Sequence, residues 1–264
     1  MIRSARRTAG TAALALLTAL GLAGCSSADD SPARGADGSP SGTVTVFAAA
    51  SLKESFTALG EHFEKEHPGT EVTFNFGGSD SLAAGIVGGA PADVFAAAST
   101  RTMRTVTGEG LTAGAPATFA RNRLEIATAP GNPHRIDSLK DLAAPDLKVV
   151  LCDRTVPCGA AAEKALEAGG VTLEPASYEQ DVKSALTKVQ LKEADAAVVY
   201  RTDVRAAGDK VDGVDFPEAA QAVNDYPVAR LEDAPNVSAA QAFVTLVTSP
   251  EGQEVLGKAG FLAP

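Results

Sequence analysis

The chain has 264 residues, of which 45% are apolar and 21% charged, and it carries a formal net charge of −10. This length and apolar content allow a substantial core, which excludes wholesale disorder and favours one large or two smaller domains. The acidic balance excludes a nucleic-acid-binding protein, which needs a basic surface, so no nucleic acid is expected as a partner.

Residues 1–24 predict a secretory signal peptide, because a basic start precedes a short apolar stretch that ends in small residues. The stretch is shorter than the roughly 20 residues that a membrane-spanning helix needs. Residues 22–25 read LAGC, which resembles the lipobox of bacterial lipoproteins. The resemblance implies that Cys25 becomes the lipidated first residue and anchors the protein to the outer face of the cell membrane. The alternative is an ordinary signal peptide with an incidental cysteine.

Residues 25–42 predict a flexible tether, because they consist mainly of Ser, Asp, Ala, Gly and Pro and cannot fill a core. No later segment is long and apolar enough to predict a transmembrane helix.

From residue 43 onward, strands and helices are expected to alternate. Ser51 is predicted to cap a helix whose apolar residues recur at positions 52, 56, 59 and 63, and Ser79 is predicted to open a second helix. The alternation favours an α/β fold with parallel sheets. Strands are expected at 44–47, 72–76, 94–95, 124–127, 148–151 and 196–200, with helices at 52–63, 79–87, 159–168 and 181–189.

Two further helices are expected at the C-terminus. Residues 238–241 form a capping-box pattern beginning at Ser238, and Ser249 followed by Pro250 marks a second helix start.

Four strand-to-helix junctions share one chemistry. Ser51 and Ser79 each follow a strand and small residues, while residues 156–159 and 180–182 precede two further helices. In open α/β sheets, ligands bind at such junctions, where helix N-termini present free N–H groups. The four junctions together predict an anion-binding site, although a single serine before a helix is more often a plain cap.

Two cysteines remain once Cys25 is assigned to the lipid. In an exported protein Cys152 and Cys158 are expected to form a disulfide, and two free thiols are the alternative. A metal site is disfavoured, because the cysteines have five residues between them and no histidine nearby.

Six strings occur in an order that resembles a known family: TVFAAASL (45–52), GAPADVFAAAS (89–99), VPCG (156–159), EQDV (179–182), VVY (198–200) and YPVA (226–229). The chain is similar, over residues 43–264, to the molybdate-binding proteins that supply ABC importers. The resemblance implies a two-lobed periplasmic-binding-protein fold of type II, with mixed, mainly parallel sheets flanked by helices. It assigns residues 43–122 and 229–264 to lobe 1 and residues 123–228 to lobe 2.

The resemblance also implies which residues bind the ligand, a tetrahedral oxyanion held between the lobes. The set comprises the hydroxyls of Ser51 and Ser79, the backbone N–H groups of Cys158 and Val182, and the phenol of Tyr200. Cys158 stands where alanine is common, which is harmless if only its amide is used.

Another departure is Asp80, which directly follows Ser79 and is expected to point outward. Apart from Lys53 and Lys183, which lie inside their helices, no lysine or arginine falls in these motifs, so neutral donors would hold the dianion.

The expected ligand is therefore molybdate, with tungstate also expected, and no cofactor. Molybdenum would be present only within molybdate, without side-chain ligands to the metal. A site made only of donors disfavours a protonated oxyanion such as phosphate. The resemblance implies an ABC permease with its ATPase as partner, and the protein is expected to be a monomer.

Three alternatives remain open: a receptor for sulfate or another tetrahedral oxyanion, an exported phosphate-ester hydrolase, and a sensory module. The hydrolase is disfavoured because the sequence around Ser79 lacks the second glycine of the G-x-S-x-G motif and no histidine base is identifiable. We therefore expect no enzyme activity.

Overall fold

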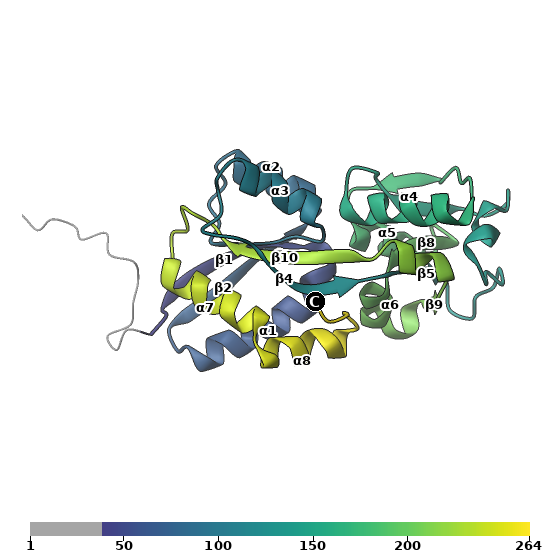
Figure 1. The fold of residues 1–264 in the computed structure, drawn as a ribbon. Helices are drawn as coiled ribbons and strands as arrows, with labels where there is room; N and C mark the ends of the chain where they lie inside the picture. Colours follow the sequence, from purple (N-terminus) through teal and green to yellow (C-terminus); the bar gives the residue numbers. More distant parts are fainter. Residues whose placement is uncertain (1–38) are drawn as a thin grey trace, which may run out of the picture. The chain divides into compact units, whose positions relative to one another are not determined.

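Two five-stranded sheets flanked by helices make up residues 39–264, the part of the chain that the computed structural model describes (Figure 1). The expected signal peptide, the lipidation site Cys25 and most of the expected tether lie outside the described residues. None of the helices in residues 39–264 is both long and apolar enough to cross a bilayer.

The first sheet has the strand order β2-β1-β3-β10-β4, in which β1 lies parallel to both β2 and β3. Strand β10 comes from late in the chain and lies antiparallel between β3 and β4. The strands are β1 (Gly42–Ala49), β2 (Thr70–Gly77), β3 (Val94–Ala96), β4 (Ala117–Asn122) and β10 (Asn224–Arg230).

Helices cover both faces of the first sheet, because alternate residues of its central strands point to opposite sides. Val94 and Ala96 pack into one apolar cluster, while Phe95 between them packs into another. Figure 1 shows the corresponding arrangement, with α2 and α3 on one side of the sheet and α1, α7 and α8 on the other. The helices are α1 (Lys53–Glu66), α2 (Ser79–Val87), α3 (Thr100–Gly108), α7 (Val237–Thr248) and α8 (Pro250–Ala259).

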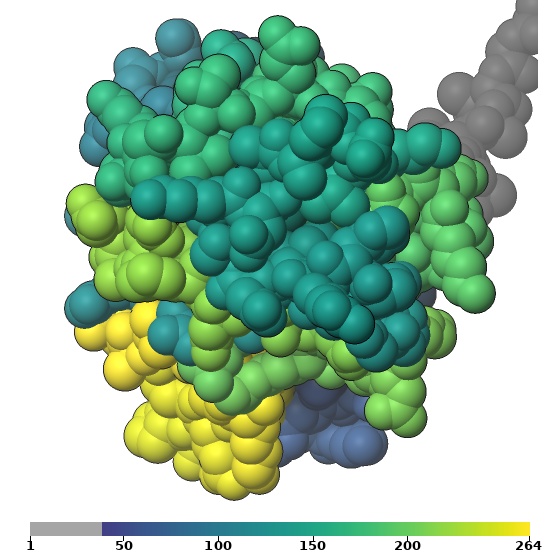
Figure 2. All heavy atoms as spheres, turned by 90° about the vertical axis from the view of Figure 1, so that its right-hand side faces the viewer, coloured from purple at the N-terminus to yellow at the C-terminus, as the bar shows by residue number. Residues whose placement is uncertain are grey.

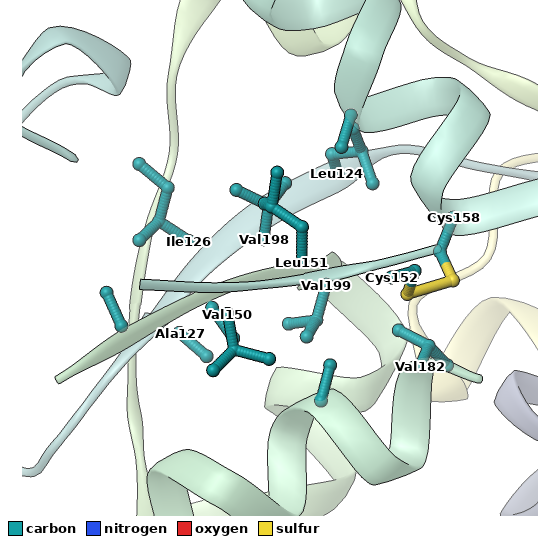
Figure 3. Packing of buried hydrophobic residues seen from close by; sticks show 14 of the residues in the cluster. Leu124, Ile126, Ala127, Val150, Leu151, Cys152, Cys158, Val182, Val198 and Val199 are labelled. Carbon is teal, nitrogen blue, oxygen red and sulfur yellow. A yellow bond between two sulfur atoms is a disulfide. The ribbon is translucent and has the colours of Figure 1, made fainter. Parts of the chain in front are cut away.

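The second sheet has the order β7-β6-β8-β5-β9, and its central strand β8 is buried at every residue, as its apolar sequence predicts. Figure 3 shows this core, and Figure 2 views the molecule from the side on which residues of the second sheet and its loops gather. The elements are β5 (Leu124–Thr128), β6 (Val149–Cys152), β7 (Ser177–Glu179), β8 (Ala196–Tyr200), β9 (Asp212–Val214), α4 (Pro157–Gly169), α5 (Val182–Gln190) and α6 (Arg201–Ala207), with 3-10 turns η1 (Ala50–Leu52), η2 (Leu139–Ala143), η3 (Gly208–Lys210) and η4 (Pro217–Gln221).

The chain passes from the first sheet to the second between β4 and β5, and it returns between β9 and β10. Each antiparallel pair in the two sheets includes β5 or β10, the strands that follow these two crossings. The sheets are therefore mixed, with more antiparallel pairing than the alternating sequence pattern predicts. The lobe boundaries at 122/123 and 228/229 stay predictions.

The helix starts predicted from the sequence agree only in part with those in the structure. They differ where the predicted capping residue bonds elsewhere or where a neighbouring residue caps the helix instead. Ser249 caps α8 as expected, while Asp181, expected as the first residue of its helix, is the cap of α5. Ser51 is not a cap: it lies within η1, and its hydroxyl contacts Tyr226 instead of a helix N–H. The expected capping box at Ser238 is also wrong, because α7 begins at Val237 and Asn236 accepts the capping hydrogen bond from Ala239 N–H.

The larger apolar cluster of the first sheet predicts that the stability of the protein depends strongly on Phe243. Its buried ring lies 5.9 Å from that of Phe56 and 5.6 Å from that of Phe63, measured between ring centroids. We expect Phe243→Ala to lower the free energy of unfolding by about 3–5 kcal/mol, because the site cannot collapse around the lost ring. Urea unfolding measures the loss, with the half-exposed Val237→Ala on the same helix as control. Equal stability of the two variants would contradict this packing.

Candidate functional site

One small cavity, about 20 Å³ in volume, brings together the five residues that the sequence predicts as ligand contacts. The first sheet supplies its strand ends, η1 and the start of α2, while the second supplies the starts of α4 and α5 and the end of β8. Its lining residues are Ala49, Ala50, Ser51, Gly77, Gly78, Ser79, Ala98, Val156, Pro157, Cys158, Asp181, Val182 and Tyr200.

The two serine hydroxyls of the cavity already have protein partners. The backbone N–H of Ala98 donates to Ser79 Oγ over 3.0 Å, so the hydroxyl proton of Ser79 remains to be donated elsewhere. Ser51 Oγ lies 2.9 Å from the phenol oxygen of Tyr226. Both serines are buried.

The third hydroxyl belongs to Tyr200, at the end of β8. The side-chain amide of Asn224 donates to its phenol oxygen over 2.7 Å. Burial raises the pKa of Tyr200 well above its ordinary value, so the phenol keeps its proton. Tyr200 is therefore a neutral hydrogen-bond donor at the cavity.

Backbone N–H groups come from two helix starts, where the first turn has no intrahelical acceptors. In α4, Pro157 occupies the first helical position and has no N–H, so Cys158 supplies the first donor. In α5, the Asp181 carboxylate accepts from the N–H groups of Lys183 and Ser184. The capping carboxylate thus takes the second and third N–H groups of α5 and leaves that of Val182.

A disulfide between Cys152 and Cys158 links the end of β6 to the start of α4. Figure 3 shows it beside Val182 at the border of the second sheet's core. The backbone packs tightly here, because a Cβ added at Gly159 would lie within 2.6 Å of the Cys152 carbonyl oxygen. With its sulfur in the disulfide, Cys158 presents its backbone N–H as its hydrogen-bond donor.

Positive charge is held away from the cavity. Lys183 Nζ lies 2.8 Å from both carboxylate oxygens of Glu54 and 3.2 Å from Oδ1 of the fully buried Asp203. Lys53 is exposed, and among the described residues that line the cavity there is no lysine, arginine or histidine. Burial alone would lower the pKa of Lys183, but Asp203 and Glu54 outweigh it and raise the pKa, so this lysine stays charged and paired.

Asp80 differs from expectation. It is half-buried rather than directed outward, and its Oδ1 is buried without a hydrogen-bond partner among the described residues. It does not line the cavity.

Gly78 brings the two halves of the site into backbone contact. A Cβ at this position would lie 2.6 Å from the carbonyl oxygen of Gln180, which precedes α5. A side chain at position 78 would therefore force the strand ends of the first sheet away from the start of α5.

Sequence reasoning did not assign a role to Asn122, Asn224 or Tyr226. Tyr226 contacts Ser51 and Asn224 donates to Tyr200, whereas Asn122 donates to Tyr226 behind the cavity. Tyr226 lies in one of the strings quoted above, but its contact with Ser51 spans 175 positions and has no local signal. For the two asparagines the sequence offers no signal.

Within the described part of the chain, no group of three or more His, Cys, Asp or Glu side chains could hold a metal ion.

Comparisons with known proteins give matches over most of the chain. The family model described as "bacterial extracellular solute-binding protein" matches residues 44–262. The Mycobacterium tuberculosis "molybdate-binding protein ModA" is 42% identical over 256 residues, covering 96% of this chain and 97% of that protein. The "substrate binding domain of putative molybdenum ABC transporter" from Clostridium difficile is 27% identical, with a TM-score of 0.63 over 85% of this chain and 100% of that chain. The Azotobacter vinelandii periplasmic molybdate-binding protein shares the fold, with a TM-score of 0.74 at 22% identity over 84% of this chain and 99% of that chain.

The buried Asp203 predicts a pH dependence of stability. Burial raises its pKa from 3.8 to about 6, although Lys183 opposes the shift. Between these values the folded protein holds a proton that the unfolded chain has released, so the contribution of Asp203 to the unfolding free energy falls as pH rises from 4 to 6. We expect Asp203→Asn to abolish this pH-dependent change in the unfolding free energy, which is on the order of 2–3 kcal/mol between pH 4 and 6.

Urea unfolding at several pH values between 4 and 7 measures the difference. Asp209→Asn, at an exposed position, serves as the control and should follow the wild-type profile. Parallel profiles for Asp203→Asn and the wild type would rule out this role.

The disulfide predicts a second stability effect. Replacing both Cys152 and Cys158 by alanine should lower the unfolding free energy by about 2 kcal/mol, because a short closed loop in the unfolded chain is released. A reductant should destabilise the wild type to a similar extent and leave the double variant unchanged. A wild type that is insensitive to complete reduction would contradict this expectation.

Proposed function

The chain belongs to the bacterial extracellular solute-binding protein family, and from this premise we propose that it binds molybdate in the cavity described above and delivers it to an ABC permease with its ATPase. The mycobacterial relative is named a molybdate-binding protein, which supports the choice of ligand. Tungstate, with the same charge and tetrahedral shape, is proposed as a second ligand. The proposed contacts are Ser51, Ser79, Cys158, Val182 and Tyr200.

The observation that carries the proposal is a cavity lined by neutral donors, with no lysine, arginine or histidine among the described residues that line it. Ser79 accepts from Ala98 N–H, so its hydroxyl proton is available to a guest. Tyr200 accepts from Asn224, and its proton can go to a guest or to Tyr226. Hydrogen bonds to a charged group contribute roughly 1.5–3 kcal/mol each, so several such donors can hold a dianion after ordering costs.

The same donors select against protonated guests. The O–H of hydrogen phosphate needs an acceptor, and Ser79 and Tyr200 each already use one of their two lone pairs on a protein donor, so the site offers few acceptors for it. Leaving that proton unpaired in a buried cavity costs roughly 1–3 kcal/mol. Molybdate, tungstate and sulfate are fully deprotonated at neutral pH and differ mainly in size, so the dimensions of the closed cavity would separate them.

We propose a binding role without catalysis. A phosphate-ester hydrolase would need an acid–base pair or a metal beside Ser79. The carboxylate that lines the cavity, Asp181, is occupied by the N–H groups of α5. For the whole protein we propose a monomer held at the outer face of the cell membrane by a lipid on Cys25, on the basis of the LAGC sequence at residues 22–25.

Calorimetric titration with molybdate, tungstate, sulfate and phosphate tests the proposal. The wild type is expected to bind molybdate and tungstate and to discriminate against phosphate. Ser51→Ala and Ser79→Ala should each weaken molybdate binding by about ten- to a hundredfold, because each removes one hydrogen bond to a charged guest.

Ser81→Ala is a matched control, since Ser81 lies on α2 near Ser79 but is exposed and does not line the cavity. Tighter binding of sulfate than of molybdate would identify a sulfate receptor instead. Unchanged affinity in both serine variants would overturn the assigned contacts while leaving the ligand in place.

A further inference from the structure

A buried hydrogen-bond network lies directly behind the cavity. Its centre is Tyr226, which is fully buried and does not line the cavity itself. Its phenol oxygen lies 2.9 Å from Ser51 Oγ, and its ring packs edge-on against Tyr200, with 6.0 Å between the centroids. Asn122 and Asn224 flank the two tyrosines and pair with each other across β4 and β10, where the chain crosses between the sheets.

The side-chain amide of Asn122 has a fixed orientation. Its Oδ1 accepts from the backbone N–H of Arg123 over 3.0 Å, so its Nδ2 must be on the other side. There Nδ2 donates to Thr202 Oγ1 over 2.8 Å and to the Tyr226 phenol oxygen over 3.4 Å. An amide nitrogen only donates, so Tyr226 accepts from Asn122.

The amide of Asn224 is fixed in the same way. Its Nδ2 lies 3.2 Å from the carbonyl oxygen of Pro157, which only accepts, and 2.7 Å from the Tyr200 phenol oxygen. Tyr200 therefore also accepts from an amide. Both phenols thus receive a hydrogen bond from an asparagine whose orientation a backbone group determines.

This arrangement limits where the phenol protons can point. Burial raises the pKa of both tyrosines, so each keeps its single proton. Tyr226 uses one lone pair to accept from Asn122, and Tyr200 is a further hydrogen-bond partner of its phenol. If Tyr200 donates to Tyr226, the Tyr226 proton is left for Ser51 Oγ, 2.9 Å away, and the Ser51 proton is free to turn toward the cavity that Ser51 lines. Hydrogen bonds that run in one direction in this way strengthen one another.

We propose that Tyr226, oriented by Asn122, is a positioning residue that fixes the Ser51 hydroxyl as a donor toward the guest and thereby sets the discrimination against protonated oxyanions. This inference rests on the proposed function, because it concerns how that site chooses its ligand. A serine hydroxyl without such a partner rotates freely and accepts from a P–OH group as readily as it donates. A hydrogen bond from Tyr226 occupies one of the lone pairs through which Ser51 would accept from P–OH.

The test is calorimetric titration of Tyr226→Phe with molybdate and, separately, with inorganic phosphate at pH 7. We expect molybdate to bind roughly tenfold more weakly. We expect phosphate to lose less affinity or to gain some, so that the ratio of the two dissociation constants narrows by about tenfold. Tyr178→Phe removes a phenol from a half-exposed position away from the cavity and should leave both constants unchanged.

A double-mutant cycle with Ser51→Ala separates positioning from a general structural effect. If Tyr226 acts through Ser51, Tyr226→Phe should cost nothing further once Ser51 is alanine. Additive losses, or an unchanged molybdate-to-phosphate ratio in Tyr226→Phe, overturn the inference.

Asn122→Ala provides a second variant should Tyr226→Phe not fold. It leaves the phenol in place but removes the amide that orients it, and it should narrow the same ratio only while Ser51 is present. A wild-type protein that binds no molybdate would overturn the proposed function itself. A wild type that binds molybdate together with an unaltered ratio in the variants would overturn only the positioning role.

Discussion

Hydrogen-bond direction is the constraint on which this site depends. A hydroxyl can donate or accept, so a cavity lined with hydroxyls has no fixed preference until the protein occupies their acceptor positions. Here Ala98 N–H does so for Ser79, and Asn224 does so for Tyr200. The capping carboxylate of Asp181, the one acidic group at the cavity, is turned back onto its own helix. The groups that line the cavity therefore offer a guest more hydrogen-bond donors than acceptors.

Hydrogen-bond direction can control selectivity here because no cationic side chain is found among the described residues that line the cavity. A lysine at the guest would attract any anion, since the field of a point charge does not distinguish a protonated oxygen from a bare one. Lys183 lies one residue from the proposed contact Val182, yet its ammonium group is neutralised by Glu54 and Asp203. The ion pairs with Asp203 and Glu54 thus keep the Lys183 ammonium group in place. The groups left to contact a ligand are hydroxyl and N–H donors, whose hydrogen bonds are directional.

How much of this the sequence predicts depends on how local each cause is. The strands at 44–47, 72–76 and 196–200 and the cap Ser249 follow from neighbouring residues, and the structure confirms them. Helix α3 was missed because four threonines give it low intrinsic propensity, and the burial of Met103 and Val106 compensates for this. Strand β10 was missed because it contains Pro227, which the sheet accommodates at an irregularity in the pairing with β4. Ser51 was mistaken for a cap because its partner Tyr226 lies 175 positions away, and no local pattern records such a contact.

The position of β10 also fixes an order of assembly. Every strand of the second sheet lies between Leu124 and Val214, so that sheet has all its strands once the chain has been made that far. The first sheet cannot close by then, because β4 pairs within the sheet only with β10, and β10 also lies against β3. Until residues 224–230 have paired, β3 and β4 each expose an unsatisfied edge, the kind of surface through which incompletely folded chains aggregate. The first sheet is thus completed only by a strand from the C-terminal part of the chain. A chain truncated before β10 would keep these strand edges unpaired and would be prone to aggregate.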